Sequence, residues 1–279
     1  GCGGFDPESA LVHWAIDVDP AEDLDDVDFQ IIVPTRTDTS YSAEIDAQPA
    51  GTNVSYYLSW ADRTGEYVAT THDGQHESLY NFWVGDQASI WCDDFEDPTS
   101  GWISGPGDLQ SSELDETWFS EWGIGSPGID LLDGPHGDVP SGASAIGTNI
   151  RGDGRYARNN AQHVLSPAVD LLHGHRSMLL LVAQRWLSVE KSEYDHAEVL
   201  ALADGETESL WQNPYDEDVR DAAWTTHSLD IRPYLHAEDL QFAWTLTTDG
   251  GLEYGGWTLD DVCVVSLAEP ERHYRVDDL

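Results

Sequence analysis

The sequence predicts an all-β chain of two domains, of which the first is a small sandwich of immunoglobulin or fibronectin type. Short β-prone segments separated by turn signals recur along the chain, and no segment shows a long helical period. A length of 279 residues suits two domains. The chain is 40% hydrophobic and contains 12 Trp, 11 Tyr and 6 Phe, so it can bury a sizeable core.

The first domain is expected over residues 1–87. An acidic run over residues 17–28 interrupts its strands. Because this run lacks the glycine and the ligand spacing of a helix-loop-helix calcium loop, we interpret it as a solvated loop, with calcium binding as the alternative. Alternating or apolar segments predict strands at residues 11–18, 29–33, 41–45, 54–60, 66–71 and 80–84.

The second domain is expected over residues 88–268, with a polar tail over residues 269–279. Residues 104–160 are rich in Gly, Ser, Asp and Pro, which predicts long loops with short strands between them. A short turn is expected at residues 231–236. The predicted strands of this domain cover residues 177–188, 197–202, 225–229, 241–247 and 257–267.

The formal net charge is −41, from 53 acidic and 12 basic residues. Such a surface repels itself unless ions screen it, so it suits a saline, halophilic setting or a bath of divalent cations. It argues against nucleic acids and anionic membranes, where Lys and Arg supply the affinity. The longest apolar run, residues 178–183, is too short to span a bilayer, so no membrane insertion is expected.

Two acidic, aromatic-flanked segments bracket the second domain, residues 92–97 and 255–263. If the first and last strands of this domain are neighbours, their carboxylates can share a cation and their cysteines a bond. We therefore pair Cys92 with Cys263 as a hypothesis, which implies an oxidising compartment. Cys2 then stays free or bonds outside the chain.

Residues 92–102, CDDFEDPTSGW, resemble the opening of MAM domains and of related jelly-roll domains in secreted bacterial proteins. These relatives include the C-terminal region of immune inhibitor A-type metallopeptidases and the cleaved-adhesin domains of gingipains. Similar motifs follow in order, at residues 145–149, 165–171, 194–199 and 249–262. The resemblance covers residues 88–268 and implies a MAM-like jelly roll. Residues 54–65 resemble the fibronectin-like module that often precedes such a domain, here with its first strand truncated or missing.

The resemblance also implies a structural calcium ion between the first and last jelly-roll strands. Calcium prefers six to eight oxygen ligands, and unpaired carboxylates this close would repel one another. The candidate ligands are Asp94, Glu96, Asp260 and Asp261. Strand alternation places Asp94 and Glu96 on one face but Asp260 and Asp261 on opposite faces, which favours Asp260 as the direct ligand. Alternatively, these acids cap turns or accept bonds from the backbone.

The sequence offers several other candidates. Glu190 and Asp195 mark a ligand or ion site or a glycosidase acid pair, or they are packing features of a strand pair. His173 and His175 are spaced to chelate zinc on a strand, and His76 lacks the second histidine of a zinc peptidase motif. A cluster of aromatic residues either stacks on sugars and anchors a partner, or belongs to the core; it comprises Trp102, Trp118, Phe119 and Trp122.

We find no catalytic motif, so the sequence predicts a non-catalytic adhesion or recognition module that binds protein or glycan. We expect it outside the cell, at the cell surface or in the periplasm, as a C-terminal accessory part of a larger exported protein such as a metallopeptidase. One alternative is a glycan-active enzyme that uses carboxylates. Another is a subunit of a calcium-dependent extracellular filament or surface layer, joined through Cys2 or an edge strand.

Overall fold

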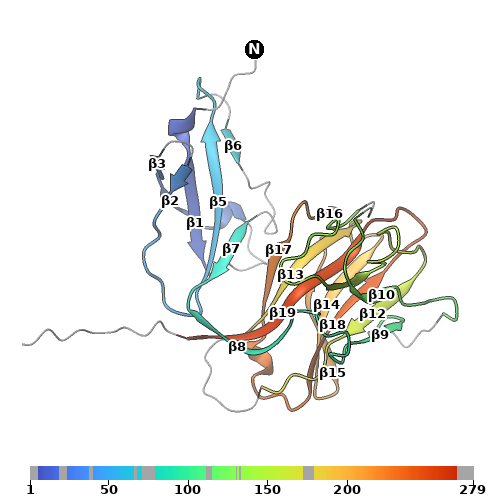
Figure 1. Ribbon diagram of the computed structural model, residues 1–279. Coiled ribbons are helices and arrows are strands. Elements are labelled where there is room, and N and C mark those ends of the chain that lie inside the picture. Colours follow the sequence, from blue (N-terminus) through green and yellow to red (C-terminus); the bar gives the residue numbers. More distant parts are fainter. Residues whose placement is uncertain are drawn as a thin grey trace, which may run out of the picture. The chain divides into compact units, whose positions relative to one another are not determined.

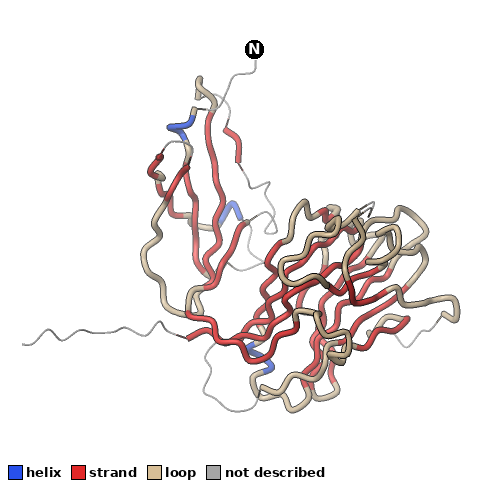
Figure 2. Tube along the Cα trace, viewed as in Figure 1, coloured by secondary structure: helices blue, strands red, loops and turns tan. Residues whose placement is uncertain are grey.

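The computed structural model describes residues 6–18, 24–37, 40–65, 68–70, 79–110, 115–129, 131, 133–171 and 179–268. The chain divides into two compact units, which Figures 1 and 2 show as strands joined by loops. Unit 1 comprises residues 1–86 and 267–279, and unit 2 comprises residues 87–266. Cys2, His76, His173, His175 and the tail over residues 269–279 lie outside the described residues.

Unit 1 is built on one antiparallel sheet. Its long strand β5 pairs on one side with β1 and on the other with β6 and β7, and β2 adds to the outer edge of β1. Buried Trp14 and Val54 anchor the β1–β5 pair. A separate hairpin joins β3 and β4. The described strands are β1 (Leu11–Ile16), β2 (Gln30–Ile32), β3 (Thr35–Thr37), β4 (Ser40–Ser42), β5 (Asn53–Ala61), β6 (Val68–Thr70) and β7 (Tyr80–Trp83).

Unit 2 is a jelly-roll sandwich of two sheets. Among the described residues, the first sheet has the order β10-β11-β19-β13-β16, with β17 paired to β13 and β8 paired to β19. The first and last strands of the unit are therefore neighbours, as predicted. The strands of this sheet are β8 (Asp86–Asp93), β10 (Trp122–Gly125), β11 (Ala145–Thr148), β13 (Leu179–Val189), β16 (Val219–Arg220), β17 (Thr225–Asp230) and β19 (Gly256–Ala268).

The second sheet of unit 2 has the order β15-β14-β18-β12-β9 among the described residues. Its central strand β18 pairs with β14 over eight residues and with β12 over five. The strands are β9 (Ile103–Pro106), β12 (Ala161–Leu165), β14 (His196–Ala203), β15 (Glu206–Gln212) and β18 (Leu240–Thr247).

The two sheets share one hydrophobic core. Trp257 on β19 packs edge-on against Trp211 at 5.6 Å between ring centroids. Its indole N–H donates across the sandwich to the carbonyl of Thr245, at 2.9 Å. Phe242 and Leu187, from opposite sheets, are both fully buried. Strands β13, β18 and β19 are buried over most of their length, as suits strands at the centre of each sheet.

Candidate functional site

A polar pocket of about 410 Å³ opens on unit 2. It is lined by three arginines, two acids, one leucine and one tyrosine: Arg155, Arg158, Arg220, Asp133, Glu253, Leu252 and Tyr254. Apart from Arg220, which ends β16, these residues come from loops between strands. The chain has only 12 lysine and arginine residues against 53 acids, so three arginines around one pocket form a distinct local feature. We call it the arginine pocket.

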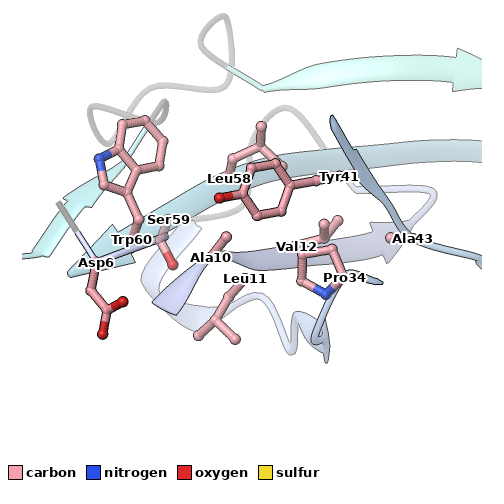
Figure 3. A pocket seen from close by; sticks show the side chains of 10 residues that line it. All are labelled: Asp6, Ala10, Leu11, Val12, Pro34, Tyr41, Ala43, Leu58, Ser59 and Trp60. Atoms are coloured by element: carbon pink, nitrogen blue, oxygen red, sulfur yellow. The ribbon is translucent and has the colours of Figure 1, made fainter. Parts of the chain in front are cut away.

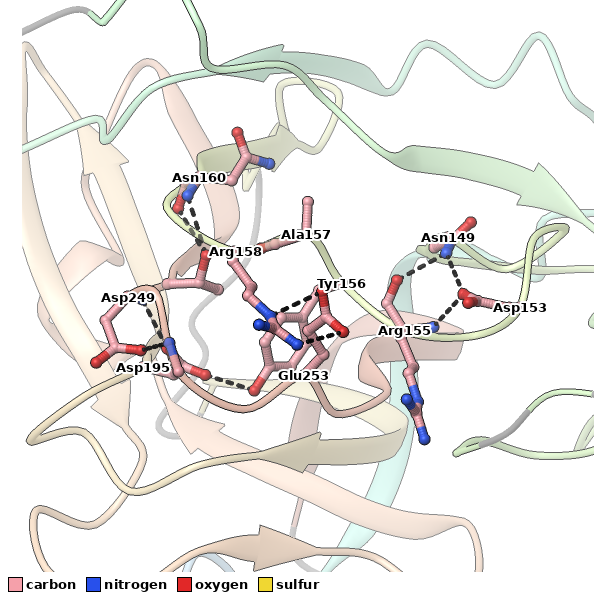
Figure 4. Close-up of polar contacts among 12 residues, drawn as sticks. Asn149, Asp153, Arg155, Tyr156, Ala157, Arg158, Asn160, Asp195, Asp249 and Glu253 are labelled. Atoms are coloured by element: carbon pink, nitrogen blue, oxygen red, sulfur yellow. Dashed lines mark hydrogen bonds and ion pairs between the residues drawn. The ribbon is translucent and has the colours of Figure 1, made fainter.

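Two of the three guanidinium groups are held in place. Arg158 forms a two-point ion pair with Glu253, at 3.0 Å and 3.2 Å (Figure 4). Arg220 lies over the ring of Tyr254, with its guanidinium carbon 4.0 Å from the centroid, and pairs with Asp218 at 3.5 Å. The guanidinium of Arg155 makes no hydrogen bond or ion pair with any described residue, and Figure 4 shows it pointing away from the other residues drawn.

The loop that carries Arg155 and Arg158 is ordered by its own polar contacts. Asn149 donates to the carboxylate of Asp153 at 2.9 Å and to the carbonyl of Arg155 at 2.7 Å. The backbone N–H of Arg155 also donates to Asp153, at 3.1 Å. Further along, the N–H of Tyr156 donates to the carbonyl of Tyr254 at 3.0 Å, which links this loop to the opposite wall of the pocket. The backbone positions of Arg155 and Arg158 are therefore set by the fold.

A group of three acids lies in the same part of the unit. Glu190, Asp195 and Asp249 place one carboxylate oxygen each within 4.8 Å of one another, so the group could hold a metal ion. Asp195 is buried and accepts bonds from the hydroxyl of Tyr156 at 2.5 Å and from the N–H of Asp249 at 2.8 Å (Figure 4). Burial, and then the charges of its acidic neighbours, raise the pKa of Asp195 and also that of Glu190.

Asn213 fixes the turn that presents these acids. Its fully buried amide donates to the carbonyls of Glu190 and Asp195, at 2.8 Å and 3.0 Å, and accepts from the N–H of Ala197 at 2.9 Å. The residues around 190–196 thus combine the two interpretations that the sequence left open. They pack and hydrogen-bond as a structural unit, and they also gather carboxylates.

The predicted calcium ligands meet around one loop, residues 141–144. Glu96 accepts bonds from the N–H groups of residues 143–144, at 2.7 Å and 2.8 Å. The N–H of Ser141 donates to Asp260 at 3.2 Å, and its hydroxyl donates to Asp261 at 2.8 Å. Gly142 has a φ of +56°, and a Cβ there would lie 2.3 Å from a Glu96 oxygen. Only glycine fits this close approach without strain.

A β-bulge overturns one expectation from strand alternation. In the pairing of β13 with β19, Val182 lies opposite Cys263, whereas Gln184 lies opposite Asp260. Strand β19 therefore carries an extra residue here, and Asp261 adopts a positive φ of 47°. Because a bulge redirects side chains, Asp260 and Asp261 both bond to the same serine, Ser141, instead of pointing to opposite faces.

The donor set of this cluster fits a hard divalent cation. Asp260 is fully buried, and burial raises its pKa to about 6; the neighbouring charges of Asp261 and Asp94 also raise it. No ion pair among the described residues involves these carboxylates or Glu96. Among the residues that the structure describes, Asp94 accepts a bond from the N–H of Glu96 alone, at 3.3 Å, so further carboxylate oxygens remain for a cation. Calcium prefers such oxygen ligands.

Cys92 and Cys263 form a disulfide that ties β8 to β19, as the sequence predicted. Nearby, the buried residue Phe95 has a positive φ of 57°, and its N–H donates to Asp93 at 2.8 Å. Asp94 and Glu96 are exposed on either side of it. Strand β8 ends at Asp93, so Asp94 and Glu96 lie beyond the strand from whose alternation a shared face was expected.

The four aromatic residues proposed as a ligand surface have different environments. Trp122 is buried in the core. Trp102 packs between Phe95 and Trp244, at 5.2 Å and 5.6 Å between ring centroids. Trp118 is partly buried, and Phe119 is 51% exposed. Phe119 is thus the member of the four that presents a ring to solvent.

A second pocket, of about 430 Å³, lies on unit 1 (Figure 3). It is mostly apolar and includes Leu11, Val12, Leu58 and Trp60, with Asp6 at its margin. It lacks basic residues and any group of acids, so its lining offers contact area but little directional chemistry.

The sequence did not indicate the arginine pocket, because the residues that line it come from separate segments. Arg155 and Arg158 lie in one loop, Arg220 lies 62 residues beyond Arg158, and Tyr254 follows in a third segment. No local pattern unites them. The sequence did show that basic residues are scarce, with 12 Lys and Arg against 53 acids, so each arginine could have been considered as a candidate site residue.

No protein-family model and no curated protein matches the chain. The similar solved structures include the Stig cyclase Fisc from Fischerella sp. TAU, with 14% identity over 66% of this chain and 100% of that one and a TM-score of 0.41. The K1 cleaved adhesin domain of Lys-gingipain from Porphyromonas gingivalis W83 has 16% identity over 64% of this chain and 98% of that one and a TM-score of 0.36.

A third similar structure is the C-terminal family 22 carbohydrate-binding module of Clostridium thermocellum Xyn10B. It shares 12% identity over 65% of this chain and 96% of that one, with a TM-score of 0.35. These likenesses are weak, and no conclusion about function rests on them. Within the described part of the chain, no helix is long and apolar enough to cross a membrane.

Proposed function

We propose that the protein is a non-catalytic recognition module that binds a glycan or a protein outside the cell. The arginine pocket is the observation that supports this proposal, because it concentrates three guanidinium groups on a chain of net charge −41. Guanidinium groups are well suited to bind carboxylates and other polar ligands through paired hydrogen bonds. The pocket also has the size of a small-molecule site, which is roughly 300–1,000 Å³.

The lining of the pocket supports binding rather than catalysis. It contains no Ser, Cys, His or Lys that could serve as a nucleophile with an adjacent base. Its two acids are Glu253 and Asp133. Glu253 is paired with Arg158, and Asp133 accepts a hydrogen bond from the hydroxyl of Ser188 at 2.6 Å. Both oxygens of Glu253 and one oxygen of Asp133 are thus engaged in holding the walls.

The raised pKa values of Glu190 and Asp195 favour a second candidate, a carboxylate-based glycan-active enzyme. The geometry fits this candidate less well. Asp195 is 1% exposed and already accepts bonds from the hydroxyl of Tyr156 and the N–H of Asp249. Polysaccharide hydrolysis that Glu190→Gln abolishes would support the enzyme.

A binding screen tests the module. The whole protein is applied to a glycan array and to a panel of extracellular matrix proteins, and each bound ligand is retested with the double variant Arg155→Gln/Arg158→Gln. We expect the double variant to lose at least tenfold in affinity, since bonds to charged groups are the strong ones. The matched control is Arg232→Gln, which removes an arginine paired with Asp230 away from the pocket. Equal binding by all three proteins would overturn the proposal.

The setting proposed for this module follows the composition and the disulfide. The disulfide Cys92–Cys263 supports an oxidising compartment, because disulfides persist there. Such a compartment fits an extracellular, cell-surface or periplasmic location. We further propose that unit 1 is a fibronectin- or immunoglobulin-like module and that the chain is an accessory part of a larger exported protein, such as a metallopeptidase. The carboxylates of Asp94, Glu96, Asp260 and Asp261 would hold a structural calcium ion, which would join the two end strands of the jelly roll.

A further inference from the structure

We propose that the arginine pocket binds the carboxylate of an acidic sugar, a hexuronic acid unit within a polysaccharide. This inference rests on the proposed function and names the ligand class for its site. A ligand of this class carries one anionic group and several hydroxyl groups on a ring with apolar C–H faces. Each of these features has a counterpart in the pocket.

The anionic group would meet Arg155. Its guanidinium has no hydrogen bond or ion pair to any described residue, whereas Arg158 and Arg220 are held by Glu253 and Asp218. An arginine fork matches a carboxylate in geometry and binds it through two parallel bonds. Arg155 is therefore the donor left available to a ligand, and the other two arginines form the pocket wall beside it as members of ion pairs.

The hydroxyl groups would meet the carboxylates of the pocket. Asp133 uses one oxygen to accept from Ser188, and its other oxygen accepts no bond from the described residues. Asp133 and the Glu253 carboxylate place strong acceptors beside strong donors. A simple anion would be repelled by these acids, but sugar hydroxyl groups donate to them. The mixed lining thus favours an acidic saccharide over an acidic peptide, whose side chains supply acceptors alone.

The apolar part of the pocket suits a sugar ring. Leu252 is 54% exposed and lines the pocket together with Tyr254. Sugar rings present C–H groups that pack on such surfaces while their hydroxyl groups bond at the edge. The volume of about 410 Å³ accommodates one or two sugar units, so the pocket would recognise a short stretch of a longer polymer.

The charge of the chain gives this site an unusual salt dependence. At about 0.01 M salt the screening length is about 30 Å, and the field of a chain with net charge −41 reaches an approaching polyanion. At about 1 M it shrinks to about 3 Å, so only contacts inside the pocket act. We expect the association rate to rise about tenfold or more over this range, because steering changes such rates by 10–10³-fold.

The test compares an oligosaccharide of a hexuronic acid with the same oligosaccharide after reduction of its carboxyl groups to alcohols. Binding to the full chain is measured by calorimetry and by surface association kinetics, at low and at high salt. We expect the acidic oligosaccharide to bind at least tenfold more tightly than the reduced one, and Arg155→Gln to remove this preference. Arg232→Gln is the control, and thermal melts confirm that both variants are folded.

The outcomes separate this inference from the proposed function. If both oligosaccharides bind equally and the double variant Arg155→Gln/Arg158→Gln weakens both, the pocket recognises glycans but the acidic-sugar inference is wrong. If neither binds, or if oligoglutamate binds as tightly as the acidic oligosaccharide, the inference is also wrong. The screen for glycan and protein ligands then decides the proposed function. An association rate that falls from low to high salt would contradict the expected repulsion between the acidic chain and the oligosaccharide.

Discussion

The fold changes the titration of His227, a half-buried side chain. It lies on β17, and its ring meets Trp211 edge-on at 5.0 Å between centroids. Burial, and then the positive charge of Arg185, lower the pKa of His227 well below its ordinary value of 6.5. The imidazole therefore stays neutral in the folded chain at pH values where it is charged in the unfolded chain.

This difference predicts a loss of stability in mild acid. Because the folded pKa is depressed, the unfolded state binds a proton that the folded state does not, once the pH falls below about 6.5. Well below this pH, the free energy of unfolding therefore falls by about 1.4 kcal/mol for each pH unit. We expect His227→Gln to remove about 1 kcal/mol of the change in unfolding free energy between about pH 6.5 and 5.5, as measured by denaturant titration.

The matched variant for this experiment is His236→Gln, which removes an exposed imidazole from the same unit. Comparing each variant with the parent cancels the carboxyl groups that titrate in the same range. Parallel pH profiles for the parent and His227→Gln would show that the imidazole at position 227 is not held neutral.

At the scale of single elements, the pairing of β8 with β19 closes the jelly roll. The disulfide between Cys92 and Cys263 spans a sequence separation of 171 residues. In the chain-entropy model, a bridge closing so long a loop stabilises the fold by about 5 kcal/mol. We expect Cys92→Ser/Cys263→Ser to lower the melting temperature of unit 2 by roughly 10–20 °C.

Differential scanning calorimetry of the double variant measures this effect. The reduced parent serves as a second form that lacks the bond but keeps both sulfur atoms. A melting temperature within 2 or so degrees of the oxidised parent in both forms, about the effect of one kcal/mol, would show that the bridge contributes little.

Sequence reasoning found the long central strands of unit 2, but it missed the short buried strand β12 (Ala161–Leu165) and the edge strand β15. Strands β13, β18 and β19 could be predicted because they are long and rich in apolar residues. Strand β15 was missed because it is an edge strand that is mostly exposed, with Glu206 and Glu208 among its residues. The same charges discourage pairing with a second chain, which weighs against a filament built through this edge.

The candidate sites also divide into those that a local sequence pattern indicates and those that depend on the folded chain. Asp94, Glu96, Asp260 and Asp261 could be chosen from the sequence because they flank the two cysteines in strands expected to pair. The role of Ser141 could not be foreseen, because it depends on a bulge in β19 and on the course of a long loop. The arginine pocket could not be foreseen either, since only the folded loops bring its residues together.

For the molecule as a whole, calcium removal is the central stability test. An ion that binds the folded chain at 100 times its dissociation constant adds about 2.7 kcal/mol. For a unit of this size, we expect a chelator to lower the melting temperature by roughly 5–10 °C. The variant Asp94→Asn/Glu96→Gln should melt at the same temperature with and without calcium.

The acid group at Glu190 provides the matched control. Glu190→Gln/Asp249→Asn removes two of its three carboxylates but leaves the cluster at Ser141 intact. This variant should keep the response to calcium. If it alone loses the response, the ion binds at Glu190, Asp195 and Asp249 instead. An unchanged melting temperature of the parent after chelation would rule out both sites.

The bond between the end strands also decides how unit 2 bears mechanical load. Ser266 donates to the carbonyl of Ala88 at 3.4 Å, and Cys92 is bonded to Cys263, so β8 and β19 run in opposite directions and share one end. Tension pulling the chain apart at that end would peel only a few residues before reaching the covalent link. The segment between the cysteines would then stay unstretched, so a tethered module could keep its pocket intact under shear.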